Sequence, residues 1–115
     1  MNKITIIKPD DMHLHIREGS IMRTALLHSE RQFARAIIMP NLDKPIMNAD
    51  MASRYFHEIK KEAPNFQPLM TVYFNNDLNN DELDKIKKLK YVYGIKLYPS
   101  GVTTNSESGT KSIDD

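Results

Sequence analysis

The sequence predicts an α/β fold built on a parallel sheet. Four apolar runs have the length and composition of β-strands, and three segments with helical periodicity lie between them. Strands that alternate with helices are typical of βα units, in which the strands run parallel. With 115 residues, 40% of them hydrophobic, the chain is sized for one soluble domain at most.

The first quarter of the chain is predicted to contain strands before its first helix. Residues 4–7 are expected to form a short strand that ends at Lys8-Pro9-Asp10. Residues 12–16 are the first of the four main strands. The turn that follows places Ser20 where it can cap a helix of about residues 21–31, because residues 22, 25, 26 and 29 share one helical face.

The second βα unit is the most clearly patterned. Residues 36–39 form a continuous apolar run that stops at Pro40, which predicts a strand buried on both faces. Asn48 can cap the next helix, in which apolar residues recur at positions 52, 55, 56 and 59 and which ends at Pro64.

The remaining units follow the same order. Residues 69–74 are the third strand, and a helix is expected from near Asn80, with acidic residues in its first turn and lysines in its last. That lysine run is interpreted as a solvated helix end. Residues 91–98 are the fourth strand, and the Gly/Ser/Thr/Asn-rich segment after Pro99 is a loop.

Four polar residues fall at or near the carboxyl ends of the predicted strands. They are His13 and His15 in the first strand, Asn41 just after the second, and Lys96 late in the fourth. In parallel α/β folds the ligand lies at this end of the sheet. We therefore expect one site to contain all four side chains.

The two histidines are one residue apart in a strand, so their side chains point to the same face. Their Cβ atoms should be about 6.5 to 7 Å apart, which lets both imidazoles reach one metal ion. A His-x-His pattern alone is a weak signal, however. The alternative is a pair of partly buried histidines that are hydrogen-bonded to their neighbours.

Composition narrows the function classes. Sixteen Lys and Arg against fifteen Asp and Glu give a net charge of +1, which favours neither nucleic acid nor a membrane surface as partner. With no cysteine, a metal would need histidine, carboxylate or a less usual ligand. No signal peptide or membrane span is recognisable, so a small-molecule substrate and a cytoplasmic location are expected.

Three motifs in order resemble dihydroorotases of the shorter bacterial class, in the amidohydrolase superfamily. They are residues 11–18 (DMHLHIRE), residues 36–42 (AIIMPNL) and residues 94–105 (GIKLYPSGVTTN). The resemblance implies the N-terminal half of a (β/α)8 TIM barrel of the metal-dependent hydrolase type, since a whole barrel needs about 250 residues. Residues 1–115 would then be a single partial domain of four βα units, with residues 99–115 as active-site loop and start of the next helix.

The resemblance also implies a reaction and its cofactors. The reaction is the reversible conversion of dihydroorotate to N-carbamoyl-aspartate in pyrimidine biosynthesis, with two Zn²⁺ per complete site. His13 and His15 would bind one metal, and a carboxylated Lys96 would bridge both, because a protonated lysine would be repelled by two cations whereas its carbamate is an anion. His15, Arg17, Asn41, Thr103 and Thr104 would bind substrate, the threonines from a mobile loop. A homodimer of the full-length enzyme is possible.

Less specific interpretations remain open. Lys96 can be a strand-end lysine that reaches to water, Arg17 and Asn41 can be ordinary loop residues, and His28 and His57 are expected on helix surfaces. The chain can belong to a related cyclic amidase acting on hydantoin or allantoin. It can also be a non-catalytic fragment, because the second metal's histidines and the acid/base aspartate of the family would lie beyond residue 115, and a half-barrel exposes both sheet edges.

Overall fold

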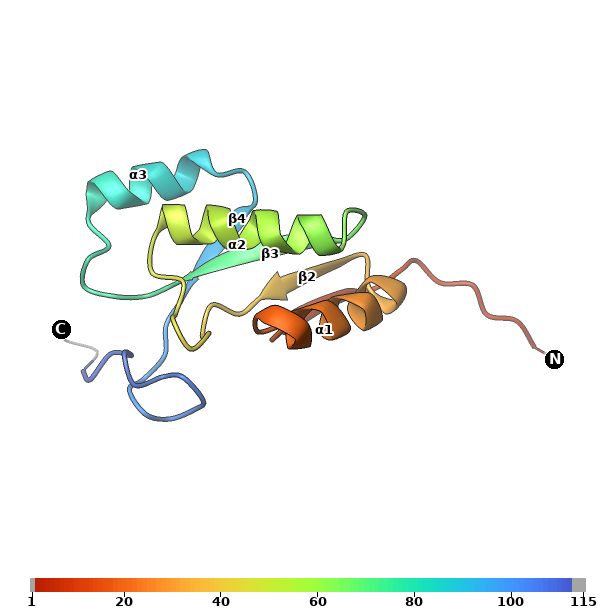
Figure 1. The fold of residues 1–115 in the computed structure, drawn as a ribbon, viewed down its shortest axis with the longest axis horizontal. Helices are drawn as coiled ribbons and strands as arrows, with labels where there is room; N and C mark the ends of the chain where they lie inside the picture. The colour runs from red at the N-terminus through yellow and green to blue at the C-terminus, as the bar shows by residue number, and fades with distance from the viewer. Residues whose placement is uncertain (1, 113–115) are drawn as a thin grey trace.

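The computed structural model describes residues 2–112, which form a four-stranded parallel sheet connected by three helices (Figure 1). The strands are β1 (Asp10–Leu14), β2 (Arg35–Ile38), β3 (Gln67–Tyr73) and β4 (Val92–Lys96). The helices are α1 (Gly19–Gln32), α2 (Ala49–Glu62) and α3 (Asn80–Lys88). The spatial order of the strands is β1-β2-β3-β4, and every neighbouring pair is parallel, as the sequence predicts.

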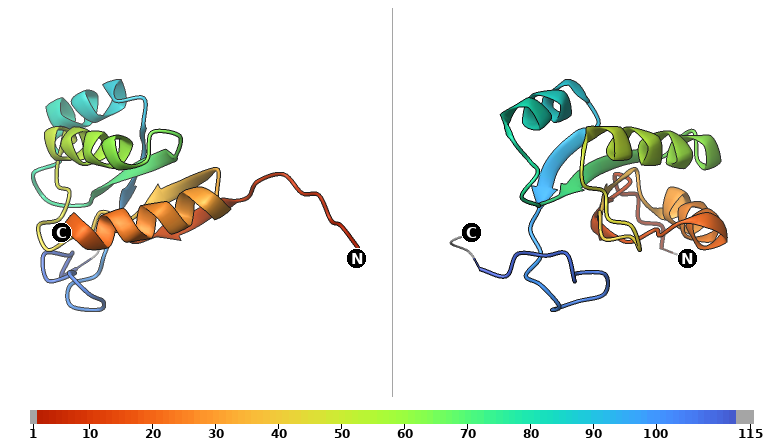
Figure 2. Two further views of the ribbon diagram at one scale, coloured as in Figure 1. Left: turned by 45° about the vertical axis from the view of Figure 1, so that its right-hand side comes forward. Right: turned by 60° about the vertical axis from the view of Figure 1, so that its left-hand side comes forward.

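The helices lie on one face of the sheet, where the hydrophobic core is (Figures 1 and 2). Leu26 of α1 and Ile59 of α2 are fully buried there, against Ala36 of β2 and Val72 of β3. Residues alternate between the two faces of a strand, so Ile37, Thr71 and the other intervening residues point to the opposite face. No helix covers that face in the part of the chain that the structure describes.

The helix boundaries agree with the capping residues in two cases. The side chain of Asn48 accepts a hydrogen bond from the Met51 backbone N–H at 2.9 Å, which confirms the predicted cap of α2. Asn79 caps α3 through the Glu82 N–H at 3.0 Å. The predicted start of α1 is wrong by two residues, because the helix begins at Gly19 and Ser20 lies inside its first turn.

The predicted strand at residues 4–7 is absent. This segment is extended but has no neighbouring strand among the described residues, and Ile4 and Ile7 are 84% and 94% exposed. A β-rich composition is not sufficient for a strand, because a strand is defined by hydrogen bonds to a partner.

The segment after β4 is a compact loop. Residues 97–112 contain turns and one isolated bridge between Pro99 and Thr110. Ser106 is fully buried in it, and its Oγ donates a hydrogen bond to the Thr103 carbonyl at 2.7 Å. The predicted start of a further helix is not seen up to residue 112, and residues 113–115 lie outside the described part, so this boundary remains a prediction.

None of the helices within residues 2–112 has the length and apolar character needed to cross a lipid bilayer.

Candidate active site

The carboxyl ends of the parallel strands bring together the side chains that the sequence places in one site. β1 carries His13, and His15 follows directly after it. Asn41 lies in the loop after β2, and Lys96 is the last residue of β4.

The two histidine rings approach each other closely. Their Nε2 atoms are 3.0 Å apart and their ring centroids 4.9 Å apart. The register of β1 against β2 shifts between Asp11 and Leu14, which is the irregular stretch that contains His13. The carboxylate of Asp11 accepts a hydrogen bond from the His13 backbone N–H at 3.0 Å and stabilises this local geometry.

This arrangement fits a shared metal ion. Bonds of about 2.0 to 2.1 Å from each nitrogen can meet at one point when the nitrogens are 3.0 Å apart. The same distance also allows a hydrogen bond between two neutral rings, one as donor and one as acceptor. The geometry is therefore compatible with both sequence-based interpretations of the histidine pair, a metal site and a hydrogen-bonded pair.

The environment of His15 favours the neutral ring that binds metal. Burial, followed by the charges of Arg17 and His13, lowers the pKa of His15, while a hydrogen bond to the Asn41 side chain opposes that shift. The charge of Lys96 also contributes, as the smallest of these causes, to the lower pKa of His15. Metal binding to histidine requires the deprotonated nitrogen, so the shift and the geometry agree.

Lys96 faces the open side of the sheet beside an aromatic pair. It is in register with Tyr73 of β3, and its Nζ lies 5.6 Å from the centroid of the Tyr98 ring. Residues 2–112 contain no cluster of three or more His, Asp or Glu side chains suited to a metal. The described part of the chain thus offers two histidines and one lysine to a metal centre.

Asn41 is the centre of a hydrogen-bond network. It is 1% exposed, its Oδ1 accepts from the Tyr98 hydroxyl at 3.0 Å, and its Nδ2 donates to the Thr104 carbonyl at 2.8 Å. Its carbonyl accepts from Arg17 Nη1 at 2.9 Å and from Asn105 Nδ2 at 3.2 Å. Asn41 therefore ties the loops after β1, β2 and β4 together.

Tyr98 belongs to the site although the sequence pattern does not predict it. Its ring stacks on Tyr73 with centroids 4.8 Å apart, and burial, with the Tyr73 hydroxyl, raises the pKa of Tyr98 to about 12. Tyr98 thus stays a neutral donor to Asn41 at physiological pH. The one available signal was its place two residues after Lys96, on the same face of an extended chain.

The candidate substrate residues Thr103 and Thr104 lie in the exposed part of the loop after β4. Their backbone groups are held by Ser106 and Asn41, whereas their hydroxyls have no hydrogen-bond partner among residues 2–112. Both hydroxyls are therefore free for a ligand. His28 and His57 lie on α1 and α2, as predicted, and His57 Nδ1 is 2.7 Å from the Ser53 carbonyl of its own helix.

Arg17 has an unusual backbone and a partly free side chain. Its φ angle is 58°, in the left-handed region that residues with a Cβ rarely adopt. Nη1 donates to the Asn41 carbonyl, and Nε and Nη2 have no acceptor among the described residues. Two guanidinium donors are thus available to an anion.

The chain is similar to curated proteins of one name, although a scan against protein-family models finds no match. The chain is 44% identical over 116 residues to a protein named mitochondrial dihydroorotase from rice, and 43% identical over 116 residues to a dihydroorotase from Acaryochloris marina, in each case over 98% of this chain. These alignments cover 29% and 34% of the two relatives.

Solved structures give the same result for the fold. The chain superposes with a TM-score of 0.83 on dihydroorotase from Saccharomyces cerevisiae in complex with 5-fluoroorotic acid, at 36% identity over 89% of this chain and 28% of that one. The TM-score is also 0.83 for dihydroorotase from Campylobacter jejuni, at 41% identity over 91% and 31% of the two chains. The predicted resemblance and the predicted partial barrel are confirmed, and the chain spans about a third of the length of its relatives.

Proposed function

We propose that the protein containing this chain is a dihydroorotase, which opens and closes the cyclic amide between dihydroorotate and N-carbamoyl-aspartate in pyrimidine biosynthesis. The observation that carries the proposal is the pair of converging Nε2 atoms of His13 and His15, 3.0 Å apart, at the carboxyl end of the sheet. They occur in a chain that is similar to dihydroorotases over nearly its whole length.

His13, His15 and Lys96 are the residues that would hold metal, with zinc as the proposed ion. Lys96 would act as a carbamate, formed when its neutral amine adds carbon dioxide and releases a proton, which gives two oxygens that can bridge two ions. When bound, the ions would supply Lewis acidity toward the amide carbonyl and lower the pKa of a water molecule.

Arg17 is the proposed anchor for the substrate carboxylate. Its Nε and Nη2 donors are free, and the planar guanidinium matches the two oxygens of a carboxylate. The Asn41 backbone carbonyl accepts the Nη1 hydrogen bond of Arg17 at 2.9 Å, and His15 lies two residues before Arg17 in the same segment. The free hydroxyls of Thr103 and Thr104 would bind substrate from the loop after β4. In that position the loop would also restrict the access of water to the substrate.

Part of the proposed site comes from outside these residues. Catalytic zinc usually has three protein ligands, and residues 2–112 hold no group of three His, Asp or Glu side chains placed to share one metal ion. The proposal therefore assigns the other metal ligands and the acid/base aspartate to chain beyond residue 115. A homodimer and a cytoplasmic location belong to the same proposal as predictions from the sequence.

The second candidate is a cyclic amidase for an uncharged substrate such as hydantoin or allantoin. The free donors of Arg17 favour dihydroorotate, because a guanidinium without a counter-ion is best matched by an anionic substrate. The two candidates share the metal chemistry and differ in whether the substrate has a carboxylate.

The test is turnover by the protein expressed at its full encoded length, with dihydroorotate, hydantoin and allantoin as alternative substrates. We expect turnover of dihydroorotate above the other two, two metal ions per chain by elemental analysis, and loss of both in Lys96→Ala. The control is Lys88→Ala, which removes an exposed lysine from the end of α3. Absence of dihydroorotate turnover in the metal-loaded protein would reject the proposal.

A further inference from the structure

Tyr55, on the buried face of α2, contacts the loop that carries Arg17. Its side chain is 3% exposed, and its hydroxyl donates a hydrogen bond to the Arg17 backbone carbonyl at 2.5 Å. The two residues are 38 positions apart in sequence. Periodicity predicts that Tyr55 is a core residue of its helix, but it does not predict a contact with the site.

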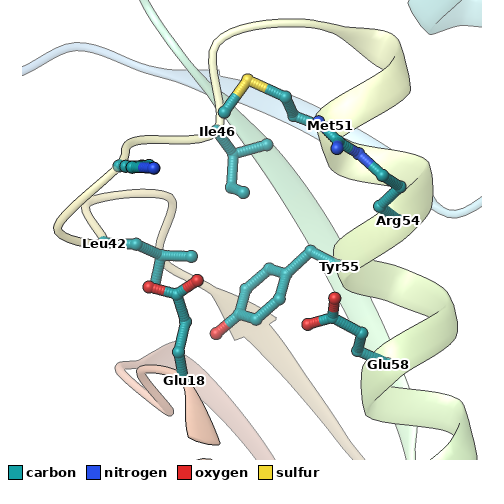
Figure 3. A pocket seen from close by; sticks show the side chains of 8 residues that line it. Glu18, Leu42, Ile46, Met51, Arg54, Tyr55 and Glu58 are labelled. Atoms are coloured by element: carbon teal, nitrogen blue, oxygen red, sulfur yellow. The ribbon is translucent and has the colours of Figure 1, made fainter.

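The surroundings of Tyr55 explain why its hydroxyl is directed at this carbonyl. The ring lies between Leu42 and Ile46 on one side and helix α2 on the other, at the edge of a cavity of about 180 Å³ (Figure 3). Glu18 and Glu58 flank the phenol in the same view (Figure 3). Burial, with the charges of these two glutamates, raises the pKa of Tyr55, so the hydroxyl keeps its proton.

Arg17 needs such support because its backbone is left-handed, with φ at 58°. This conformation is disfavoured for residues with a Cβ and persists where the surroundings hold it. Two tethers act on Arg17: Tyr55 holds its carbonyl, and the Asn41 carbonyl holds Nη1 at 2.9 Å. Together they fix both ends of the residue and determine where its free Nε and Nη2 donors point.

We infer that Tyr55 is a positioning residue for substrate binding, which acts through Arg17 and sets the affinity for the substrate carboxylate. This inference rests on the proposed function. Tyr55 touches neither the substrate nor the histidines; it orients the guanidinium that does the binding. No bond to the carboxylate forms or breaks in the reaction, so its contact with Arg17 should be equally strong in the bound substrate and in the transition state. Loss of such uniform binding raises KM more than it lowers kcat, and loss of Tyr55 should have the same effect.

The experiment compares four forms of the full-length protein: unsubstituted, Tyr55→Phe, Arg17→Met and the double variant. Tyr55→Phe removes one oxygen and keeps the ring that fills the core. We expect it to raise KM for dihydroorotate roughly 5- to 30-fold, the effect of one lost hydrogen bond to a buried carbonyl, with kcat changed less than about two-fold. In the Arg17→Met background the same change should have no further effect on KM, because the two residues act as one unit.

Tyr91→Phe is the matched control. Tyr91 packs on α2 by stacking on Phe56, with ring centroids 3.8 Å apart, and its hydroxyl has no hydrogen-bond partner among the described residues. The Tyr91→Phe substitution should leave KM and kcat unchanged. Thermal unfolding of all forms separates a loss of stability from a loss of affinity.

Each outcome is decisive. An unchanged KM in Tyr55→Phe, or an equal rise in KM with and without Arg17, would overturn the positioning role while leaving the proposed function intact. If the unsubstituted protein has no dihydroorotate turnover, the proposed function fails and this inference fails with it. A KM effect that disappears in the Arg17→Met background supports the inference.

Discussion

The two faces of the sheet differ in how much of their environment this chain provides. On the helix-covered face the chain forms its own hydrophobic core, in which Leu26 of α1, Ile59 of α2 and Val72 of β3 are fully buried. The opposite face carries His13, His15 and Lys96, and the described residues there include no group of three His, Asp or Glu side chains suited to a metal ion. The core is formed between neighbouring βα units of this chain, whereas the proposed site takes its remaining metal ligands from chain beyond residue 115.

The largest expected effect tests this difference directly. The 115-residue chain alone should have no detectable dihydroorotase turnover, even with zinc and bicarbonate, because two histidines fall short of the three protein ligands usual at catalytic zinc. The measurement is a turnover assay on purified chain of verified mass, prepared from a host that lacks its own enzyme. Steady turnover that Lys96→Ala abolishes would show that the chain assembles a complete site.

His13→Ala in the full-length protein should affect only the face of the sheet that the helices do not cover. We expect loss of one metal ion per site and a fall in kcat/KM of about 10³-fold or more, because a ligand to the ion that activates water is removed. The unfolding midpoint of the metal-free protein should stay nearly unchanged. His57→Ala, on the surface of α2, is the control. A metal content that is the same in both variants would contradict the assignment of His13.

Ile59→Ala should act on the helix-covered face alone. The side chain is fully buried, so its truncation should lower the free energy of unfolding by about 2 to 5 kcal/mol. Denaturant unfolding measures the loss, and the folded fraction should keep its KM. Leu27→Ala, at a position that is 49% exposed, should cost far less. A changed KM in folded Ile59→Ala would mean that the two faces are coupled.

Arg17→Met should have the smallest of these effects and the most selective one. KM for dihydroorotate should rise about 10- to 100-fold, because a charge-assisted pair with the substrate carboxylate is lost. An analogue without the carboxylate should be bound as before. Steady-state kinetics on both substrates provide the comparison, with Arg31→Met on α1 as control. Equal losses on the two substrates would show that Arg17 has a structural role only.

The predictions from sequence succeeded where the information is local. Asn48 caps α2 because its side chain reaches an N–H three residues ahead, and apolar periodicity is enough to place α2 and the central strands. The prediction of a strand at residues 4–7 is wrong because a strand needs a neighbouring strand to pair with, and the residue pattern does not show whether one is present. The start of α1 was misplaced because Glu18, which is not a typical capping residue, occupies the cap position.

The candidate site divides in the same way. Residues two apart in an extended chain point to the same side, so the spacing of His13 and His15 predicts that their rings lie together, although the predicted strand 12–16 ends at Leu14 in the structure and leaves His15 outside it. The spacing does not predict the network around Asn41, since its contacts with Tyr98 and Thr104 join residues 57 and 63 positions apart. The Tyr55 contact with Arg17 is likewise invisible in the sequence, because a tyrosine on a helical apolar face is fully explained by packing.

The left-handed backbone at Arg17 has a consequence for protein engineering. Glycine at this position would relieve roughly 1 kcal/mol of backbone strain, partly offset by the greater entropy of its unfolded chain. The substitution also loses the Arg17 Nη1 hydrogen bond to the Asn41 carbonyl, a loss of about 1 kcal/mol that is similar in size to the strain relieved. A library sorted only for folding would therefore tolerate Arg17→Gly and discard the guanidinium. Selection for thermal tolerance should hold position 17 fixed, or include a ligand-binding step in every round.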